Sequence, residues 1–167
     1  MRSWLGLGAN LGCVQLTLKA AIGQIAKTPG ITCLASSSLY RTQPIDAVGP
    51  DYCNAVMAIQ TSLSPQALLA TCQKIEADFG RVRTFRHAPR TLDIDILLYE
   101  NSELNQADLV IPHPRLTERA FVLIPLIEIN PDMVIPGQHG RADAFLSSVA
   151  GQRTEKISEI SSAACVL

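Results

Sequence analysis

Residues 91–99 read Thr-Leu-Asp-Ile-Asp-Ile-Leu-Leu-Tyr and form the clearest strand pattern in the chain. Polar and apolar residues alternate along the first part of this segment, which is typical of a β-strand with one buried face. Side chains two positions apart on a strand point to the same side, so Asp93 and Asp95 project together. Leu92, Ile94 and Ile96 face the other way. The segment therefore predicts a strand that carries two neighbouring carboxylates.

Five elements are predicted upstream of this strand: strands over residues 3–9, 31–40 and 52–61, a helix from about residue 14 to Thr28-Pro29-Gly30, and a second helix from 64 to 80. Asn10 is expected to cap the first helix, because its side-chain oxygen can accept from an unpaired backbone N–H. Ser64 followed by Pro65 marks the start of the second helix. Gly80 marks its end, since glycine is a common helix terminator.

The predicted order is β-α-β-β-α-β, which is the split-βαβ or ferredoxin-like pattern. The fold class is therefore α+β, with a four-stranded antiparallel sheet and two helices on one face. The connections over 41–51 and 80–91 are long, and long loops in compact domains often bind ligands.

A C-terminal helical extension is expected after residue 100, with a Pro-His-Pro turn at 112–114, a helix near 115–129 and a weaker one near 141–150. We expect residues 1–167 to form a single domain, with a tail of uncertain order after about 151.

Composition excludes several classes of protein. The chain has 167 residues, of which 47% are hydrophobic and 17% charged, and this balance excludes intrinsic disorder. The net charge of −1 disfavours a general nucleic-acid binder. No apolar run approaches the roughly 18 residues of a membrane span. The five cysteines include no Cys-x-x-Cys pair, so we expect reduced thiols in a cytoplasmic protein.

The segment before Asp93 is rich in arginine. Residues 81–90 hold four of the fourteen lysine and arginine residues of the chain. Arginine forks bind phosphate oxygens in a bidentate manner, and a pair of carboxylates suits Mg²⁺, which binds one or two carboxylates together with substrate phosphates. The alternative is a solvated acidic pair beside a salt-bridging loop. The adjacent arginines favour the phosphate site over that alternative, and no Walker-type glycine loop is present to bind phosphate instead.

Other candidates are ambiguous from their residue types alone. Glu76 could be a surface carboxylate or could face a nucleotide. Tyr52 and Asn54 share a strand face and could stack on and hydrogen-bond a flat heterocycle. From the residue types alone, an edge tyrosine and a turn asparagine are the favoured interpretation. Phe121 is by default a core residue, and a single histidine such as His113 is usually structural.

Eight segments of the chain, spread between about residues 4 and 137, resemble one family, that of 6-hydroxymethyl-7,8-dihydropterin pyrophosphokinase of folate biosynthesis. The segments are Gly8-Ala9-Asn10-Leu11-Gly12, Tyr40-Arg41-Thr42, Asp51-Tyr52-Cys53-Asn54-Ala55, Gln73-Lys74-Ile75-Glu76, Gly80-Arg81-Val82-Arg83, Pro89-Arg90-Thr91-Leu92-Asp93-Ile94-Asp95, Ile111-Pro112-His113-Pro114 and Arg119-Ala120-Phe121-Val122-Leu123. The Pro-Arg-Thr-Leu-Asp-x-Asp segment is the most specific of them.

The resemblance implies a role for each matching residue. Asp93 and Asp95 would hold two Mg²⁺ ions that bridge the ATP phosphates. Either Asp95 or a metal-bound water could ease the departure of the hydroxyl proton. The other residues fall into three groups: Arg81 and Arg90 would steer catalysis; Gln73, Glu76, Arg83, His113 and Arg119 would contact ATP; Tyr52, Phe121, Asn54 and Thr42 would bind the pterin.

The reaction implied by the resemblance is transfer of a diphosphate from ATP to the hydroxymethyl group of the dihydropterin, with release of AMP. The expected partners are these two small molecules, without nucleic acid or membrane, and the expected state is a monomer. Two alternatives use the same fold: an RNA-recognition-like binding module and an inactive sensor of pterin or nucleotide. The intact aspartate pair argues against the sensor.

Overall fold

The computed structural model describes residues 1–44, 49–80, 91–138 and 140–159 and contains one main antiparallel sheet. The strands of this sheet are β1 (Arg2–Ala9), β2 (Ile31–Ser36), β3 (Leu39–Thr42), β4 (Tyr52–Thr61), β5 (Asp93–Tyr99) and β10 (Thr154–Ser158). They run in the order β10-β3-β4-β1-β5, and β2 also pairs with β4. The neighbours β4, β1 and β5 all pair in antiparallel fashion, as the ferredoxin-like pattern requires.

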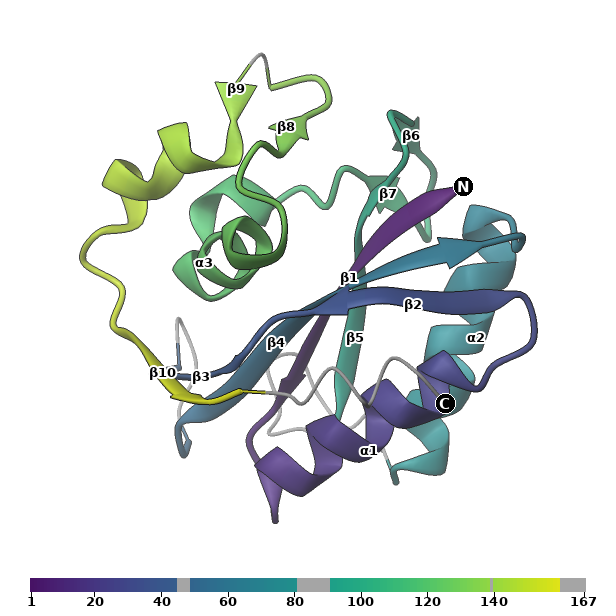
Figure 1. Ribbon diagram of the computed structural model, residues 1–167, viewed down its shortest axis with the longest axis horizontal. Helices are drawn as coiled ribbons and strands as arrows, with labels where there is room; N and C mark the ends of the chain where they lie inside the picture. Colours follow the sequence, from purple (N-terminus) through teal and green to yellow (C-terminus); the bar gives the residue numbers. More distant parts are fainter. Residues whose placement is uncertain (45–48, 81–90, 139, 160–167) are drawn as a thin grey trace.

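Helices cover both faces of the sheet (Figure 1). The helix α1 (Val14–Ala26) and the helix α2 (Pro65–Asp78) lie on one face, while α3 (Ala120–Ile129) and the 3-10 helix Ala142–Val149 lie on the other. The remaining elements are the 3-10 helix Leu116–Glu118 and two small hairpins, β6 (Leu104–Asn105) with β7 (Val110–Ile111) and β8 (Val134–Ile135) with β9 (Gly140–Arg141).

The sheet has a separate hydrophobic cluster on each face. Ile94 and Ile96 of β5 pack in the cluster formed with α1 and α2, whereas Leu97 belongs to the cluster that contains Leu123 and Leu126 of α3. The inward side chains of β1, Leu5 and Leu7, also face α1 and α2. The predicted division of β5 into an apolar face and an aspartate face is therefore confirmed.

The strand predicted over 31–40 is interrupted. It forms β2 and β3, which pair with successive parts of β4. The break lies at Ser37-Ser38, where the Ser37 hydroxyl accepts from the backbone N–H of Val56 at 2.9 Å. Ser38 donates from both its N–H and its hydroxyl to Glu128 of α3, at 2.9 and 2.7 Å. A contact with a helix about 90 residues away therefore breaks the strand.

Three other local predictions are wrong or incomplete. Asn10 does not cap α1, since that helix begins after Cys13 and has no side-chain cap. The helix expected near 115–129 divides at Arg119, whose backbone is extended. The residues after 151 include β10, which pairs with β3 at the edge of the sheet (Figure 1). The Ser64 cap of α2 is confirmed by a hydrogen bond from the Ala67 N–H at 3.2 Å.

The cysteines differ in part from the expectation. Cys13, Cys53 and Cys72 are free thiols. Cys33 is disulfide-bonded, so the expectation that all five thiols are reduced is wrong at this position. Among the described residues, no helix has the length and apolar character to cross a membrane.

Candidate active site

Three adjacent strands form the floor of one cavity, on the face of the sheet that α3 covers. In the strand register, Asp93 of β5 and Asn54 of β4 both lie opposite Gly8 of β1, and Asp95 lies opposite Gly6. A Cβ atom at Gly8 would stand 2.9 Å from Oδ1 of Asn54. The two glycines therefore leave open space between the aspartates and the asparagine, and this space is part of a cavity of about 170 Å³.

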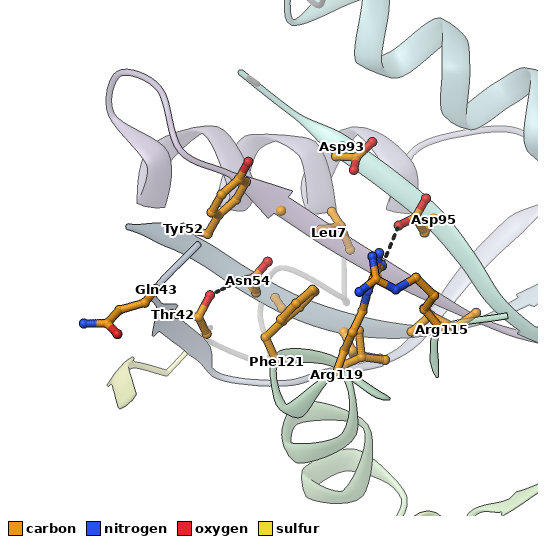
Figure 2. A pocket seen from close by; sticks show the side chains of 16 residues that line it. Leu7, Thr42, Gln43, Tyr52, Asn54, Asp93, Asp95, Arg115, Arg119 and Phe121 are labelled. Carbon is orange, nitrogen blue, oxygen red and sulfur yellow. Dashed lines mark hydrogen bonds and ion pairs between the residues drawn. The ribbon is translucent and has the colours of Figure 1, made fainter. Parts of the chain in front are cut away.

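One end of the cavity carries two aromatic rings and a polar pair. Tyr52 of β4 and Phe121 of α3 enter from different elements (Figure 2). Asn54 and Thr42 are both buried, and the Asn54 amide donates to the Thr42 hydroxyl at 2.7 Å. Because Thr42 accepts this bond, its own O–H can donate to a bound molecule. Two rings and a hydrogen-bonding amide can hold a flat heterocycle.

The other end of the cavity carries the aspartates together with basic side chains. The Arg119 guanidinium lies 4.0 Å from Asp95 (Figure 2), and its carbon Cζ lies 5.5 Å from the centre of the Phe121 ring. His113 does not line the cavity, but its Nε2 lies 3.9 Å from the same Asp95 carboxylate. The Asp95 side chain is 41% exposed, so it remains accessible to a ligand. Arg119 thus joins the acidic end of the cavity to the aromatic end.

His113 is electrically neutral at physiological pH. Burial, followed by the positive charge of Arg119, lowers the pKa of its imidazole to about 4. The Nδ1 atom accepts from the backbone N–H of Arg115 at 3.1 Å. The proton of the neutral ring therefore resides on Nε2, the nitrogen that faces Asp95. In this state His113 can donate a hydrogen bond without adding charge.

Glu76 is neither on the surface nor in the wall of the cavity. The residue is 3% exposed, and its Oε1 accepts from the backbone N–H of Ile94 at 2.7 Å. The surface alternative for this residue is therefore wrong. Glu76 acts on the site through the backbone between Asp93 and Asp95, and a direct contact with ATP stays a prediction.

The remaining predicted residues divide into two groups. Gln73 lies on the exposed side of α2 and does not line the cavity, so its contact with ATP stays a prediction. Arg81, Arg83 and Arg90 lie outside the described residues. The cavity therefore brings together seven of the predicted positions: Thr42, Tyr52, Asn54, Asp93, Asp95, Arg119 and Phe121.

The structure adds residues that the sequence patterns did not assign to the site. Arg115 lines the cavity, and so do Gly6 and Gly8. Gly6 and Gly8 alternate along a buried strand, and glycine inside a strand often marks a close approach of another group. This pattern could have indicated from the sequence that both residues line a site. For Arg115 the signal was its spacing of four residues from Arg119.

Asp93 and Asp95 could bind a divalent metal ion only if a substrate supplied further ligands. Across the part of the chain that the structure describes, no three His, Cys, Asp or Glu side chains gather into a metal-binding group. Asp93 and Asp95 nevertheless project together from β5 into the cavity (Figure 2). A hard cation such as Mg²⁺ commonly takes one or two carboxylates and completes its shell with water and phosphate oxygens. The aspartate pair fits that mode of binding.

Comparison with known families identifies this arrangement. Residues 4–131 match the family model described as 7,8-dihydro-6-hydroxymethylpterin-pyrophosphokinase (HPPK). The chain belongs to the HPPK family. It is therefore an ATP-dependent diphosphotransferase that transfers the diphosphate of ATP to hydroxymethyldihydropterin in folate biosynthesis. Membership favours this enzyme over the RNA-recognition alternative.

Individual relatives agree with the family model. The chain is 48% identical over 138 residues to a 2-amino-4-hydroxy-6-hydroxymethyldihydropteridine pyrophosphokinase of Methylorubrum extorquens, which covers 82% of this chain and 87% of the relative. It is 42% identical over 135 residues to the protein of the same name in Haemophilus influenzae, with 80% and 84% covered.

Solved structures support the HPPK fold. A crystal structure of HPPK-DHPS in complex with substrates superimposes on this chain with a TM-score of 0.73. The two chains share 15% identity, and the match covers 88% of this chain and 43% of the other. The match shows that the fold of this chain also occurs in part of the HPPK-DHPS chain.

Proposed function

We propose that the cavity between β1, β4, β5 and α3 is where this diphosphate transfer takes place. The observation that carries the proposal is a single cavity with ring-stacking groups at one end and an aspartate pair with arginines at the other. The pterin would lie between Tyr52 and Phe121, with its edge at Asn54 and Thr42. The ATP phosphates would lie toward Asp93, Asp95 and Arg119. The pterin hydroxymethyl group would then point at the phosphates.

The reaction consists of one in-line displacement. The pterin hydroxyl oxygen bonds to the β-phosphorus of ATP and gives up its proton to Asp95 or to water. The bond between that phosphorus and the oxygen that bridges it to the α-phosphate breaks, and AMP leaves with that oxygen. Phosphoryl transfer depends mainly on positioning and charge stabilisation. The aromatic pair and Asn54 orient the hydroxyl, while Arg119 and Arg115 place positive charge beside the phosphates. The neutral His113 can donate from Nε2 to an oxygen at the same end of the cavity.

Asp93 and Asp95 would hold Mg²⁺ at this site, and two ions are predicted. Bound Mg²⁺ would neutralise charge on the phosphate oxygens and fix their orientation. The need for a metal would explain why two carboxylates lie at the end of a cavity that must also accept polyanionic ATP. Without a cation, these carboxylates and the phosphates would repel each other.

The test of this proposal is the release of AMP from ATP, measured with Mg²⁺ in the presence and absence of hydroxymethyldihydropterin. The wild-type chain should release AMP only when the pterin is present. Asp95→Ala should lower kcat by about two orders of magnitude or more and leave the fold intact, because its side chain is partly exposed. Asp108→Ala changes an exposed aspartate that does not line the cavity and serves as the matched control. Near-wild-type turnover by Asp95→Ala would refute the proposed site.

Several properties remain predictions. We propose that residues 1–167 form one domain, that the enzyme is a monomer and that it binds no nucleic acid. The requirement for ATP supports a cytoplasmic location. Size-exclusion chromatography with light scattering tests the oligomeric state directly.

A further inference from the structure

Gln152 holds the backbone on both sides of Arg119. Its Oε1 accepts from the N–H of Ala120 at 2.8 Å, and its Nε2 donates to the carbonyl of Glu118 at 2.8 Å. Glu118 ends a 3-10 helix and Ala120 begins α3, and Arg119 between them has φ −126° and ψ 110°. One amide side chain therefore fixes the short extended linker from which Arg119 projects.

This contact replaces the usual cap of the helix. The first N–H groups of a helix have no partner within the helix and need an acceptor from elsewhere. Arg119, at the N-cap position of α3, makes no side-chain capping bond. Gln152 supplies the acceptor from 32 residues further along the chain. The next residue of α3 is Phe121, so the cap also fixes the start of the turn from which this ring enters the cavity.

Gln152 is itself held in place by the 3-10 helix Ala142–Val149 on one side and by the main sheet on the other. Its backbone N–H donates to the carbonyl of Val149 at 2.9 Å. Two residues later the chain enters β10, where Thr154 pairs with Thr42 of β3. The segment 152–154 thus links the first turn of α3 to the strand that carries Thr42. Thr42, Phe121, Gln152 and Thr154 also line a second cavity of about 240 Å³ that shares residues with the candidate site.

We propose that Gln152 is a positioning residue for the pterin, acting through the first turn of α3 and the ring of Phe121. The inference rests on the proposed pterin site between Tyr52 and Phe121. The matched family region ends at residue 131, so Gln152 belongs to a C-terminal segment that the family match does not include. This segment would set the spacing between the ring that stacks on the pterin and the strand that hydrogen-bonds it.

The test compares the pterin dissociation constant of the full chain and its variants in the presence of a non-hydrolysable ATP analogue. Gln152→Met keeps the length and approximate volume of the side chain but removes both hydrogen bonds. We expect the dissociation constant to rise about three- to tenfold, the range expected for the loss of one or two such bonds. Gln106→Met removes an exposed amide hydrogen bond to Gln66 in another part of the chain and should leave the constant unchanged.

A double-mutant cycle separates positioning from a general structural effect. If Gln152 acts through Phe121, then adding Gln152→Met to Phe121→Ala should weaken pterin binding by less than about 1.5-fold, because coupled residues give non-additive effects. Gln152→Glu retains the acceptor for Ala120 but loses the donor to Glu118, so its dissociation constant should lie between those of the wild type and Gln152→Met. This variant also serves as the test if Gln152→Met does not fold.

The possible outcomes test the role of Gln152 and the proposed pterin site separately. If Phe121→Ala weakens pterin binding but Gln152→Met only lowers the melting temperature, then Gln152 is merely structural and the inference is wrong. Additive losses in the double mutant would overturn it as well. If Phe121→Ala leaves pterin affinity unchanged, then the proposed pterin site is wrong, and the role of Gln152 fails with it.

Discussion

The carboxylate of Glu76 accepts a hydrogen bond from the backbone N–H of Ile94, the residue between Asp93 and Asp95. Among the described residues, β5 is the last strand of the sheet, and no further strand pairs with it on the side of this N–H. The carboxylate of Glu76, which belongs to α2, accepts the hydrogen bond that a further strand would accept. A buried side chain on one face of the sheet thereby fixes the backbone that presents two carboxylates on the other.

Removing this acceptor should affect both stability and the aspartate pair. Glu76→Ala leaves the Ile94 N–H without its partner and should lower the free energy of unfolding by about 1–3 kcal/mol, the cost of an unsatisfied buried donor. It should also raise the Mg²⁺ concentration needed for half-maximal activity. Denaturant unfolding and a Mg²⁺ titration of AMP release measure the two effects. Glu76→Gln keeps an acceptor oxygen, so its free energy of unfolding should fall less than that of Glu76→Ala, and its Mg²⁺ requirement should rise less. An unchanged Mg²⁺ titration for Glu76→Ala would contradict the positioning role.

A methyl group at Gly8 should impair pterin binding while leaving the fold in place. The new Cβ atom would stand 2.9 Å from Asn54 Oδ1, so the Asn54 side chain must move away from its position in the cavity. We expect Gly8→Ala to raise the KM for the pterin several-fold with little change in the KM for ATP. Gly23→Ala in α1 is the matched control, because a Cβ atom there meets nothing within 4 Å. The control should be stabilised by about 0.5–1 kcal/mol, since alanine favours a helix interior. Equal KM values for wild type and Gly8→Ala would disagree with the proposed role of Asn54.

Glu128 should make the stability of the chain depend on pH. Burial alone would raise the pKa of this carboxyl, but the hydrogen bonds from Ser38, Lys156 and Tyr40 outweigh it and hold the pKa below 4.5. A carboxyl with a lowered pKa stabilises the fold above its unfolded pKa, and this contribution is lost as the pH falls through the folded value.

Glu128→Gln should therefore lower the free energy of unfolding by about 1 kcal/mol at pH 7, a modest value because the group is partly exposed. The difference from the wild type should shrink as the pH falls below 4.5 and vanish in more acidic solution. Denaturant unfolding curves of both proteins between pH 3 and pH 8 measure this difference. A difference that stays constant over that range would show that the charge of Glu128 contributes nothing.

The parts of the fold that depend on local pattern could be predicted from the sequence. The alternation around Asp93 predicts β5 and its two faces correctly, and Ser64 and Pro65 predict the start of α2. The break at Ser37-Ser38 could not be predicted, because it depends on Glu128 far along the chain. The strand β10 was missed for a similar reason: its short polar sequence forms a strand only because the edge of β3 is available for pairing.

The candidate site, like the fold, could be predicted from the sequence only where it depends on local pattern or family resemblance. Spacing alone placed Asp93 and Asp95 together, and the family resemblance supplied the roles of Tyr52 and Phe121. Neither source could reveal that Glu76 binds the Ile94 backbone, because a carboxylate beside an apolar stripe is usually on the surface. The link from Gln152 to Ala120 depends on how two distant segments pack, and residue spacing carries no information about that.

The most direct test of the central claim is the position of the divalent metal in a crystal structure with Mg²⁺, a non-hydrolysable ATP analogue and hydroxymethylpterin. We expect oxygens of both Asp93 and Asp95 about 2.0–2.1 Å from Mg²⁺, with the phosphates on the same ions and the pterin between Tyr52 and Phe121. If both carboxylates instead face bulk solvent while the nucleotide binds elsewhere, the proposed active site is wrong.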